Sequence, residues 1–276
     1  MTDVVLGIDS STQSTKVEAR LLGTGAVVAS ASASHPPTTP PVSEQDPTAW
    51  WAAAAAACAQ IPPQVRNGVV AVSVAGQQHG LVLLDEDGLA VRPAKLWNDT
   101  TSATEATALV NATNPDAWAA AIGSLPVAAF TISKLAWVAH HEPANLARVA
   151  QVLLPHDYLT WCLSGRFVTD RGDASGTGWF DASTDSYRPE LLNLIGIDGA
   201  SWLERLPTVL GPHESVGLIT PQAASSLGLP DNVVIGPGSG DNMGAALGLG
   251  LNVGDLVMSL GTSGVAYARS ATPTRD

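Results

Sequence analysis

The sequence predicts an α/β fold, a mixed sheet flanked by helices. Short apolar runs of strand length, such as 4–8, 17–22 and 69–75, alternate with longer segments of helical composition. That alternation is typical of α/β proteins. Hydrophobic residues make up 45% and charged residues 14%, which is the balance of a globular chain. A length of 276 residues suits one or two domains.

The N-terminal part is predicted to open with a three-stranded meander. Residues 4–8 and 17–22 form a β-hairpin around a polar turn, and 27–33 add a third strand. A helix then runs from Pro47 to Gln60, because Asp46 can cap its free amides and proline suits the first helical position.

The rest of the chain is predicted to alternate short strands with helices. The buried strand 69–75 ends at a loop of sequence GQQHG, and no fixed-period repeat is present. The remaining elements are a strand at 81–84, helices over 100–148 with a break at 123–126, a strand at 152–154 followed by a helix, a strand at 233–235, a helix at 241–249 and a second hairpin at 253–267.

Composition excludes several classes of partner. The net charge of −12 argues against nucleic acid and anionic membranes, which need basic surfaces. The most apolar stretch, 49–59, is shorter than the roughly 20 residues that span a bilayer, and no export signal opens the chain. Cys58 and Cys162 are expected to be small, reduced core residues, so a cytoplasmic protein is predicted.

Two acidic residues stand at positions suited to phosphoryl transfer. Asp9 precedes a turn rich in serine and threonine, where it would hold Mg²⁺ beside phosphate oxygens; the alternative is a solvated turn. Asp241 begins a helix whose dipole favours its charged form, so it can accept a hydroxyl proton or simply cap the helix. Glycines 236, 238 and 240 favour the first role, because they leave room for a ligand.

Weaker candidates follow two of the strands. Gln78 and His79 in the GQQHG loop suit a polyol-binding edge or a structural turn. Trp97 and Asp99 can form a sugar platform or a capped helix start. Asp170 and Asp173 can be site carboxylates, although a turn is favoured.

Other site types are not supported. None of the three lysines follows a glycine, so there is no phosphate-binding P-loop. The glycine-rich stretch lacks the dinucleotide fingerprint, and no serine lies in a hydrolase elbow. His140 and His141 are adjacent on a helix, so they are expected to point in different directions and to make a poor metal pair.

In combination, these segments resemble the FGGY family of carbohydrate kinases, most closely its xylulokinases. The phrases that carry the resemblance occur in order along nearly the whole chain: GID at 7–9, SEQDP at 43–47 with Trp50 and Trp51, GQQHG at 76–80, LWND at 96–99, FTISKLAW at 130–137, LLPHDY at 153–158, DN at 241–242 and SLGTSG at 259–264. The family has two actin-like, or ribonuclease-H-like, domains with a cleft between them.

The resemblance implies ATP-dependent phosphorylation of a small sugar, D-xylulose above all, with Mg²⁺. Asp241 would be the general base and Asp9 would hold the metal. The implied sugar contacts are Gln78, His79, Trp97, Asp99 and Asn242, and the implied phosphate contacts are Asp9, Ser10, Thr12, Gly261, Thr262 and Ser263. Gln78 and His156 depart from the methionine and lysine that we take as typical, which leaves the sugar open.

The resemblance also implies a division of the chain. Residues 1–249 would be the N-terminal sugar-binding domain, and 250–276 the incomplete start of the nucleotide-binding domain. The 276-residue chain alone is therefore expected to be inactive. Ribulose, glycerol or gluconate as substrate, a truncated sugar-binding module without chemistry, and a homodimer are the alternatives left open.

Overall fold

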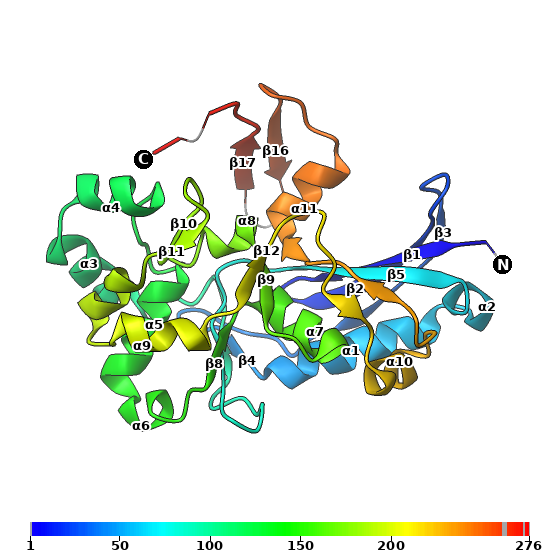
Figure 1. Ribbon diagram of the computed structural model, residues 1–276, viewed down its shortest axis with the longest axis horizontal. Coiled ribbons are helices and arrows are strands. Elements are labelled where there is room, and N and C mark those ends of the chain that lie inside the picture. The colour runs from blue at the N-terminus through cyan, green and yellow to red at the C-terminus, as the bar shows by residue number, and fades with distance from the viewer. Residues whose placement is uncertain (1, 261–263, 273, 276) are drawn as a thin grey trace.

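A computed structural model describes residues 2–260, 264–272 and 274–275, and its largest sheet is mixed, with β1, β2, β3 and β5 on the right in Figure 1. The strand order is β13-β14-β5-β1-β2-β3, and β15 also pairs with β5. The strands are β1 (Val4–Ser10), β2 (Ser14–Leu21), β3 (Val27–Ser34), β5 (Val69–Gly76), β13 (Gly217–Leu218), β14 (Val234–Ile235) and β15 (Ser239–Gly240). The predicted meander and the buried strand after it are confirmed.

Strict alternation gives this sheet two different faces. Val4, Leu6 and Ile8 of β1 are buried, whereas Gly7 and Asp9 are exposed. The alternation follows from the two-residue period of a strand. On the buried face lie α1 (Pro47–Gln60), α7 (Pro155–Ser164) and α10 (Pro221–Leu227), which lie on one side of the sheet in Figure 1. Asp9 therefore lies on the opposite face.

A second hydrophobic core lies beside the sheet and is built mainly from helices. Its centre includes Trp118, Leu135 and Trp179, all nearly inaccessible to solvent. The remaining helices are α2 (Pro63–Arg66), α3 (Ala103–Ala112), α4 (Pro115–Ile122), α5 (Thr131–His141), α6 (Pro143–Leu146), α8 (Arg171–Ala174), α9 (Gly199–Trp202), α11 (Asp241–Gly248) and the 3₁₀ helices Pro189–Ile195 and Leu203–Arg205. The predicted break near 123 is the end of α4, where Gly123 takes a left-handed conformation with φ 83°.

The other strands form short pairs at the edges of the two cores. These are β4 (Glu44–Gln45) with β7 (Ala94–Lys95), β6 (Val82–Leu84) with β8 (Gln151–Leu153), β9 (Val168–Asp170) with β12 (Thr208–Leu210), β10 (Phe180–Asp181) with β11 (Ser186–Tyr187), and β16 (Leu256–Leu260) with β17 (Gly264–Ala268).

The last of these pairs confirms the predicted C-terminal hairpin. The strands β16 and β17 form a two-stranded sheet of their own. The side chains of Leu256, Met258 and Leu260 are 66%, 65% and 80% exposed. Within the described ranges, no helix is long and apolar enough to cross a membrane. Both cysteines are free thiols, with Cys58 fully buried and Cys162 partly so.

The start of α1 is capped as the sequence predicts. The Asp46 carboxylate accepts hydrogen bonds from the Thr48 amide at 2.9 Å and the Thr48 hydroxyl at 2.7 Å. Replacing Asp46 by Ala is expected to lower the free energy of unfolding by about 1 kcal/mol, because the amide loses its acceptor. Urea denaturation measures the change. The exposed Asp231→Ala is the control, and equal stability of the two variants would contradict the capping role.

Candidate functional site

Strand register brings Asp9 close to the start of α11. Asp9 of β1 is opposite Ala75 of the parallel strand β5, and Ala75 is opposite Ser239 of β15. The three residues therefore form one row across the sheet, and Asp241 follows Ser239 by two positions. The negative charge of Asp9 raises the pKa of Asp241, so the two carboxyl groups interact.

Burial has the largest effect on the pKa of both Asp9 and Asp241, and it raises both values. At Asp241 the burial effect is opposed by the Asn242 amide, which donates to Oδ1 at 2.7 Å. At Asp9 the partial loss of water is opposed by Lys16, its cross-strand neighbour. Asp241 is the first helical residue and Gly240 is the N-cap. The expectation that the helix start favours the charged form of Asp241 is therefore outweighed by burial and by Asp9.

The glycines before Asp241 pack closely against neighbouring residues. A side chain at Gly238, which has φ 82°, would meet His156 Nδ1 at 2.7 Å and the Val74 carbonyl at 2.9 Å. A side chain at Gly240 would meet Gln78 Cγ at 2.7 Å. The space where a side chain would stand is therefore filled by protein at both positions. Gly238 also lines the hollow of about 580 Å³ described below, so the expectation that these glycines leave room for a ligand stays a prediction. Glycine is needed because the loop packs directly on neighbouring side chains.

Gln78 connects the GQQHG loop to α11. Its Oε1 accepts from Asn242 Nδ2 at 2.8 Å, and its Nε2 lies 3.1 Å from Met243 Sδ. The Gln78 side chain is buried, so the amide pair fixes the orientation of Asn242. Two of the predicted sugar contacts, Gln78 and Asn242, are thus adjacent and next to Asp241.

His79 lies in the same loop in a left-handed conformation with φ 62°. Its ring stacks on Phe130 with centroids 5.3 Å apart. Burial, with a smaller effect from the charge of Lys134, lowers the pKa of His79 to about 4. Within the described part of the chain, its buried Nδ1 has no hydrogen-bond partner. The ring is therefore a neutral imidazole at pH 7, packed against the backbone of Gly176.

Trp97 connects the N-terminal turn to this region. Its Nε1 donates to Thr12 Oγ1 at 2.9 Å, and the ring is 40% exposed. Thr12 is thus close to the predicted sugar platform. Ser10, by contrast, is 1% exposed and accepts a hydrogen bond from Thr15 at 3.3 Å, so its hydroxyl is occupied inside the sheet.

Asp99 is fully buried behind this platform. Its Oδ1 lies 3.2 Å from Lys95 Nζ, and its Oδ2 accepts from the Ser43 amide at 2.8 Å. Burial raises its pKa, but hydrogen bonds from Thr101 and Ser43 and the charge of Lys95 outweigh burial and lower it. Both oxygens therefore have protein partners. Asp99 does not cap the following helix, as the alternative had it, because the N-cap of α3 is Ser102.

A buried cluster of charges, which the sequence did not reveal, lies beneath the glycine loop. His156 Nε2 is 3.2 Å from Asp157 Oδ1, 3.2 Å from Asp170 Oδ1 and 3.4 Å from Asp173 Oδ2. The side chains of His156, Asp157 and Asp173 are fully buried. Asp170 also caps α8 by accepting from the Gly172 amide at 2.7 Å, so the predicted turn role and a role in this cluster coexist.

The pKa values show how the cluster shares its charge. Burial lowers the pKa of His156, but the three carboxylates outweigh burial and raise it to about 10. Burial raises the pKa of Asp157 to about 6 and that of Asp173 to about 8, and Asp241 adds to the rise at Asp173. His156 is therefore an imidazolium held by acids that are coupled to the candidate base. The signal in the sequence was the His-Asp pair after Pro155.

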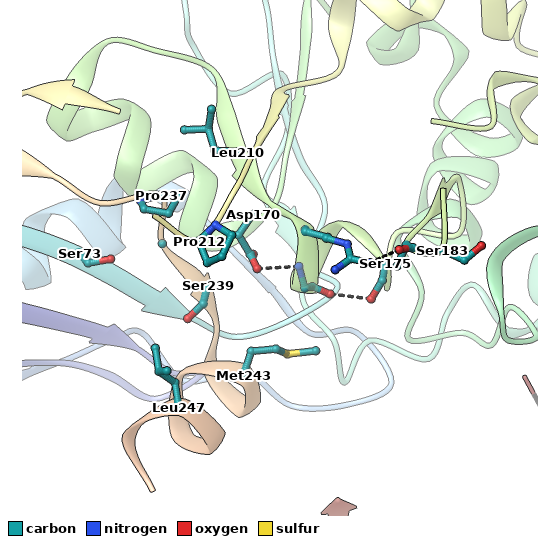
Figure 2. Close-up of a pocket in the computed structure, with 14 residues that line it drawn as sticks. Ser73, Asp170, Ser175, Ser183, Leu210, Pro212, Pro237, Ser239, Met243 and Leu247 are labelled. Carbon is teal, nitrogen blue, oxygen red and sulfur yellow. Dashed lines mark hydrogen bonds between the residues drawn. The ribbon is translucent and has the colours of Figure 1, made fainter. Parts of the chain in front are cut away.

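Two hollows adjoin the row of residues on the exposed face of the sheet. One of about 350 Å³ is lined by Asp9, Lys16, Ser73 and Ser239 among others. The other, of about 580 Å³, has Asp170, Ser239 and Met243 on its walls and is drawn in Figure 2. Asp241 lines neither. Gly261, Thr262 and Ser263, the other predicted phosphate contacts, lie outside the described residues.

Comparison with known proteins gives consistent results. The N-terminal domain of the FGGY family of carbohydrate kinases matches residues 4–248. The xylulose kinase of Streptomyces coelicolor is 47% identical over 276 residues, which cover 98% of this chain and 56% of the relative. That of Streptomyces rubiginosus is 46% identical with the same coverage. The chain therefore spans about half the length of these relatives.

Solved structures agree on the fold. The xylulose kinase of Bifidobacterium adolescentis has a TM-score of 0.84 and 38% identity, over 96% of this chain and 58% of that one. The xylulose kinase of Rhodospirillum rubrum has a TM-score of 0.91 and 28% identity, over 99% of this chain and 56% of that one. The predicted fold of an actin-like sugar kinase is confirmed.

Replacing His156 by Lys is expected to flatten the pH dependence of stability above pH 6.5. The folded chain keeps the His156 proton up to a pKa of about 10, whereas an unfolded imidazole releases it near 6.5. The protonated His156 therefore contributes its full share to the free energy of unfolding below pH 6.5. That contribution is lost as the pH rises through about 10. A lysine stays charged in both states over this range, so its variant lacks that loss.

Urea denaturation at several pH values between 6.5 and 10 measures this slope. The exposed His213→Lys is the matched control and should behave as the unmodified chain does. If His156→Lys and the unmodified chain lose stability equally over the range, His156 is not held as an imidazolium.

Proposed function

Because the chain belongs to the FGGY family of carbohydrate kinases, we propose that it supplies the sugar-binding half of an ATP-dependent kinase. The proposed reaction is phosphorylation of a ketopentose, D-xylulose to D-xylulose 5-phosphate. The carrying observation is that strand register sets Asp9 and Asp241, distant in sequence, close enough for the charge of Asp9 to add to the rise of the Asp241 pKa that burial causes. The names of the Streptomyces relatives support xylulose as the sugar.

Asp241 is the proposed general base. One of its oxygens is held by the Asn242 amide, which leaves the other for the substrate. In the reaction the carboxylate takes the proton of the terminal sugar hydroxyl while that oxygen bonds to the γ-phosphorus and the bond from phosphorus to ADP breaks. A raised pKa suits this role, because a stronger base accepts the proton more readily provided that it stays ionised.

The sugar would lie between the GQQHG loop, Trp97 and the start of α11. Asn242 and Gln78 hold each other in place, so their remaining hydrogen-bonding groups are pre-oriented. Neutral His79 can donate to one hydroxyl or accept from another. The exposed face of Trp97 offers an apolar surface for the carbon skeleton. Asp99 would act indirectly, by fixing the turn that carries Trp97.

Asp9 would hold Mg²⁺ and the turn after it would face the ATP phosphates. The fit rests on chemistry: Asp9 is an exposed carboxylate next to a second one, and oxygen ligands are what Mg²⁺ prefers. When bound, the ion would offset the charge of the phosphates. Thr12 is the better side-chain contact of the turn, because the Ser10 hydroxyl is buried. Residues 261–263 are proposed to complete the phosphate site.

The hairpin after residue 249 is proposed to begin a second, nucleotide-binding domain. Its apolar side chains are largely exposed, as expected for strands that pair with further chain. The 276-residue chain would then bind the sugar but lack an adenine pocket. The proposed compartment is the cytoplasm.

Replacing Asp241 by Asn is expected to lower kcat by about 10²- to 10⁴-fold, because the amide cannot take the hydroxyl proton. Sugar affinity should change little, since Asn keeps the shape of the side chain. Turnover is measured with Mg-ATP and D-xylulose in the protein that includes the second domain. The exposed Asp231→Asn is the control, and near-normal kcat in the Asp241 variant would refute the assignment.

The 276-residue chain itself is expected to bind D-xylulose without transferring phosphate. Isothermal titration with D-xylulose, D-ribulose, gluconate and glycerol ranks the candidate sugars, and His79→Ala should weaken binding because a neutral hydrogen-bonding group is lost. A coupled ADP assay tests transfer. Vigorous ATP-dependent phosphorylation by this chain would contradict the need for a second domain, and equal affinity for all four compounds would contradict a ketopentose site.

A further inference from the structure

Outside the proposed kinase site, Glu105 and two histidines converge on one point. Glu105 lies in the first turn of α3, and His140 and His141 are the last residues of α5. Glu105 Oε1 is 3.2 Å from His141 Nε2 and 3.6 Å from His140 Nδ1. The expectation that the adjacent histidines point apart is wrong. At the end of a helix the two rings lie 4.5 Å apart and approach the same oxygen.

Among the described residues, the Glu105 carboxylate has no lysine or arginine partner. Its side chain is nearly buried, and its ion-pair partners among the described residues are His140 and His141. Its Oε2 is buried and, within the same part of the chain, has no hydrogen-bond partner. A buried carboxylate oxygen without a partner is unfavourable. A bound cation would satisfy it.

The spacing of the three atoms suits a transition metal. One nitrogen of each histidine and Glu105 Oε1 all lie within 4.8 Å of one another. Zinc bonds of about 2.0–2.2 Å at tetrahedral angles put neighbouring ligand atoms about 3.4 Å apart. The distances from Glu105 Oε1 to the two histidine nitrogens, 3.2 and 3.6 Å, fall on either side of that value. Neutral imidazole nitrogens with a carboxylate are ligands that Zn²⁺ accepts and that Mg²⁺ does not favour.

The surroundings hold these ligands in place. The His141 ring stacks on Trp137 with centroids 4.8 Å apart. The next residue, Glu142, accepts from Arg92 Nε at 2.8 Å, which anchors the end of α5. Arg92 and Lys95 also lie over the Trp137 ring. Arg92 is paired with Glu44 and Glu142, and Lys95 with Glu44 and Asp99, so their charges are compensated. Fixed second contacts of this kind strengthen metal sites.

We propose that Glu105, His140 and His141 form a binding site for a divalent transition-metal ion of the zinc type. The histidine side chains are 74% and 45% exposed, so water completes the coordination. The ion links the start of α3 to the end of α5 and stabilises the helical part of the chain. The site is independent of the proposed kinase reaction.

Calorimetric titration of the chain, free of any histidine tag, with Zn²⁺ tests the proposal. One ion per chain is expected, with Mg²⁺ giving no signal at this site. Glu105→Gln, His140→Ala and His141→Ala should each weaken Zn²⁺ binding by about tenfold or more. The exposed His213→Ala is the matched control and should bind as the unmodified chain does. Absence of stoichiometric binding, or affinity in the three variants equal to that of the unmodified chain, would overturn the site.

Two further measurements separate this site from loose surface binding. Co²⁺ should give the intense visible absorption of a four-coordinate ion, and Glu105→Gln should abolish it. Zn²⁺ should raise the melting temperature of the unmodified chain and of His213→Ala, but not of Glu105→Gln. Circular dichroism checks that each variant is folded. Six-coordinate Co²⁺ spectra, or an equal rise of the melting temperature in all variants, would count against the proposal.

Discussion

The register between β1, β5 and β15 is the constraint on which the candidate site depends. It places Asp9, Ala75 and Ser239 in one row, and the chain then turns into α11 with Asp241 at its start. Because side chains alternate along a strand, a shift of β1 by one residue would move Asp9 to the face covered by α1. The apolar residues of β1 fix the register from the opposite face. The alternation of side chains along β1 therefore determines both which residues enter the core and on which face Asp9 lies.

Beneath this row, a buried charge supports the loop that carries Asp241. Gly238 packs on the His156 ring, and a side chain at Gly172 would meet Asp170 at 2.8 Å and Met243 at 3.0 Å. The cluster around His156 therefore lies against both the loop before α11 and the first turn of that helix. Removing one partner from such a buried group is costly, since the others are left without compensation. The start of α11 is consequently positioned by electrostatics as well as by packing.

Much of this arrangement could be predicted from local patterns. Three features follow from neighbouring residues alone and are present in the structure. They are the buried alternation in 4–8, the helix start at Asp46-Pro47 and the helix end at Gly123. The partners of Asp99 and His156 could not be predicted, because they depend on which segments meet in three dimensions. The packing of Gly238 on His156 could not be predicted for the same reason: glycine signals a close approach, but not what approaches.

The same limit explains the two histidines at the end of α5. Helical geometry separates neighbouring side chains by about 100°, so the sequence argued against a pair. His140 and His141 still belong to α5, and the backbone leaves helical geometry only at Glu142, with φ −132° and ψ 53°. The two rings therefore approach each other through the orientation of their side chains, and the His141 ring stacks on Trp137. Both features are tertiary. In this chain, ionisable groups gather where elements end, because side chains of neighbouring elements can meet there.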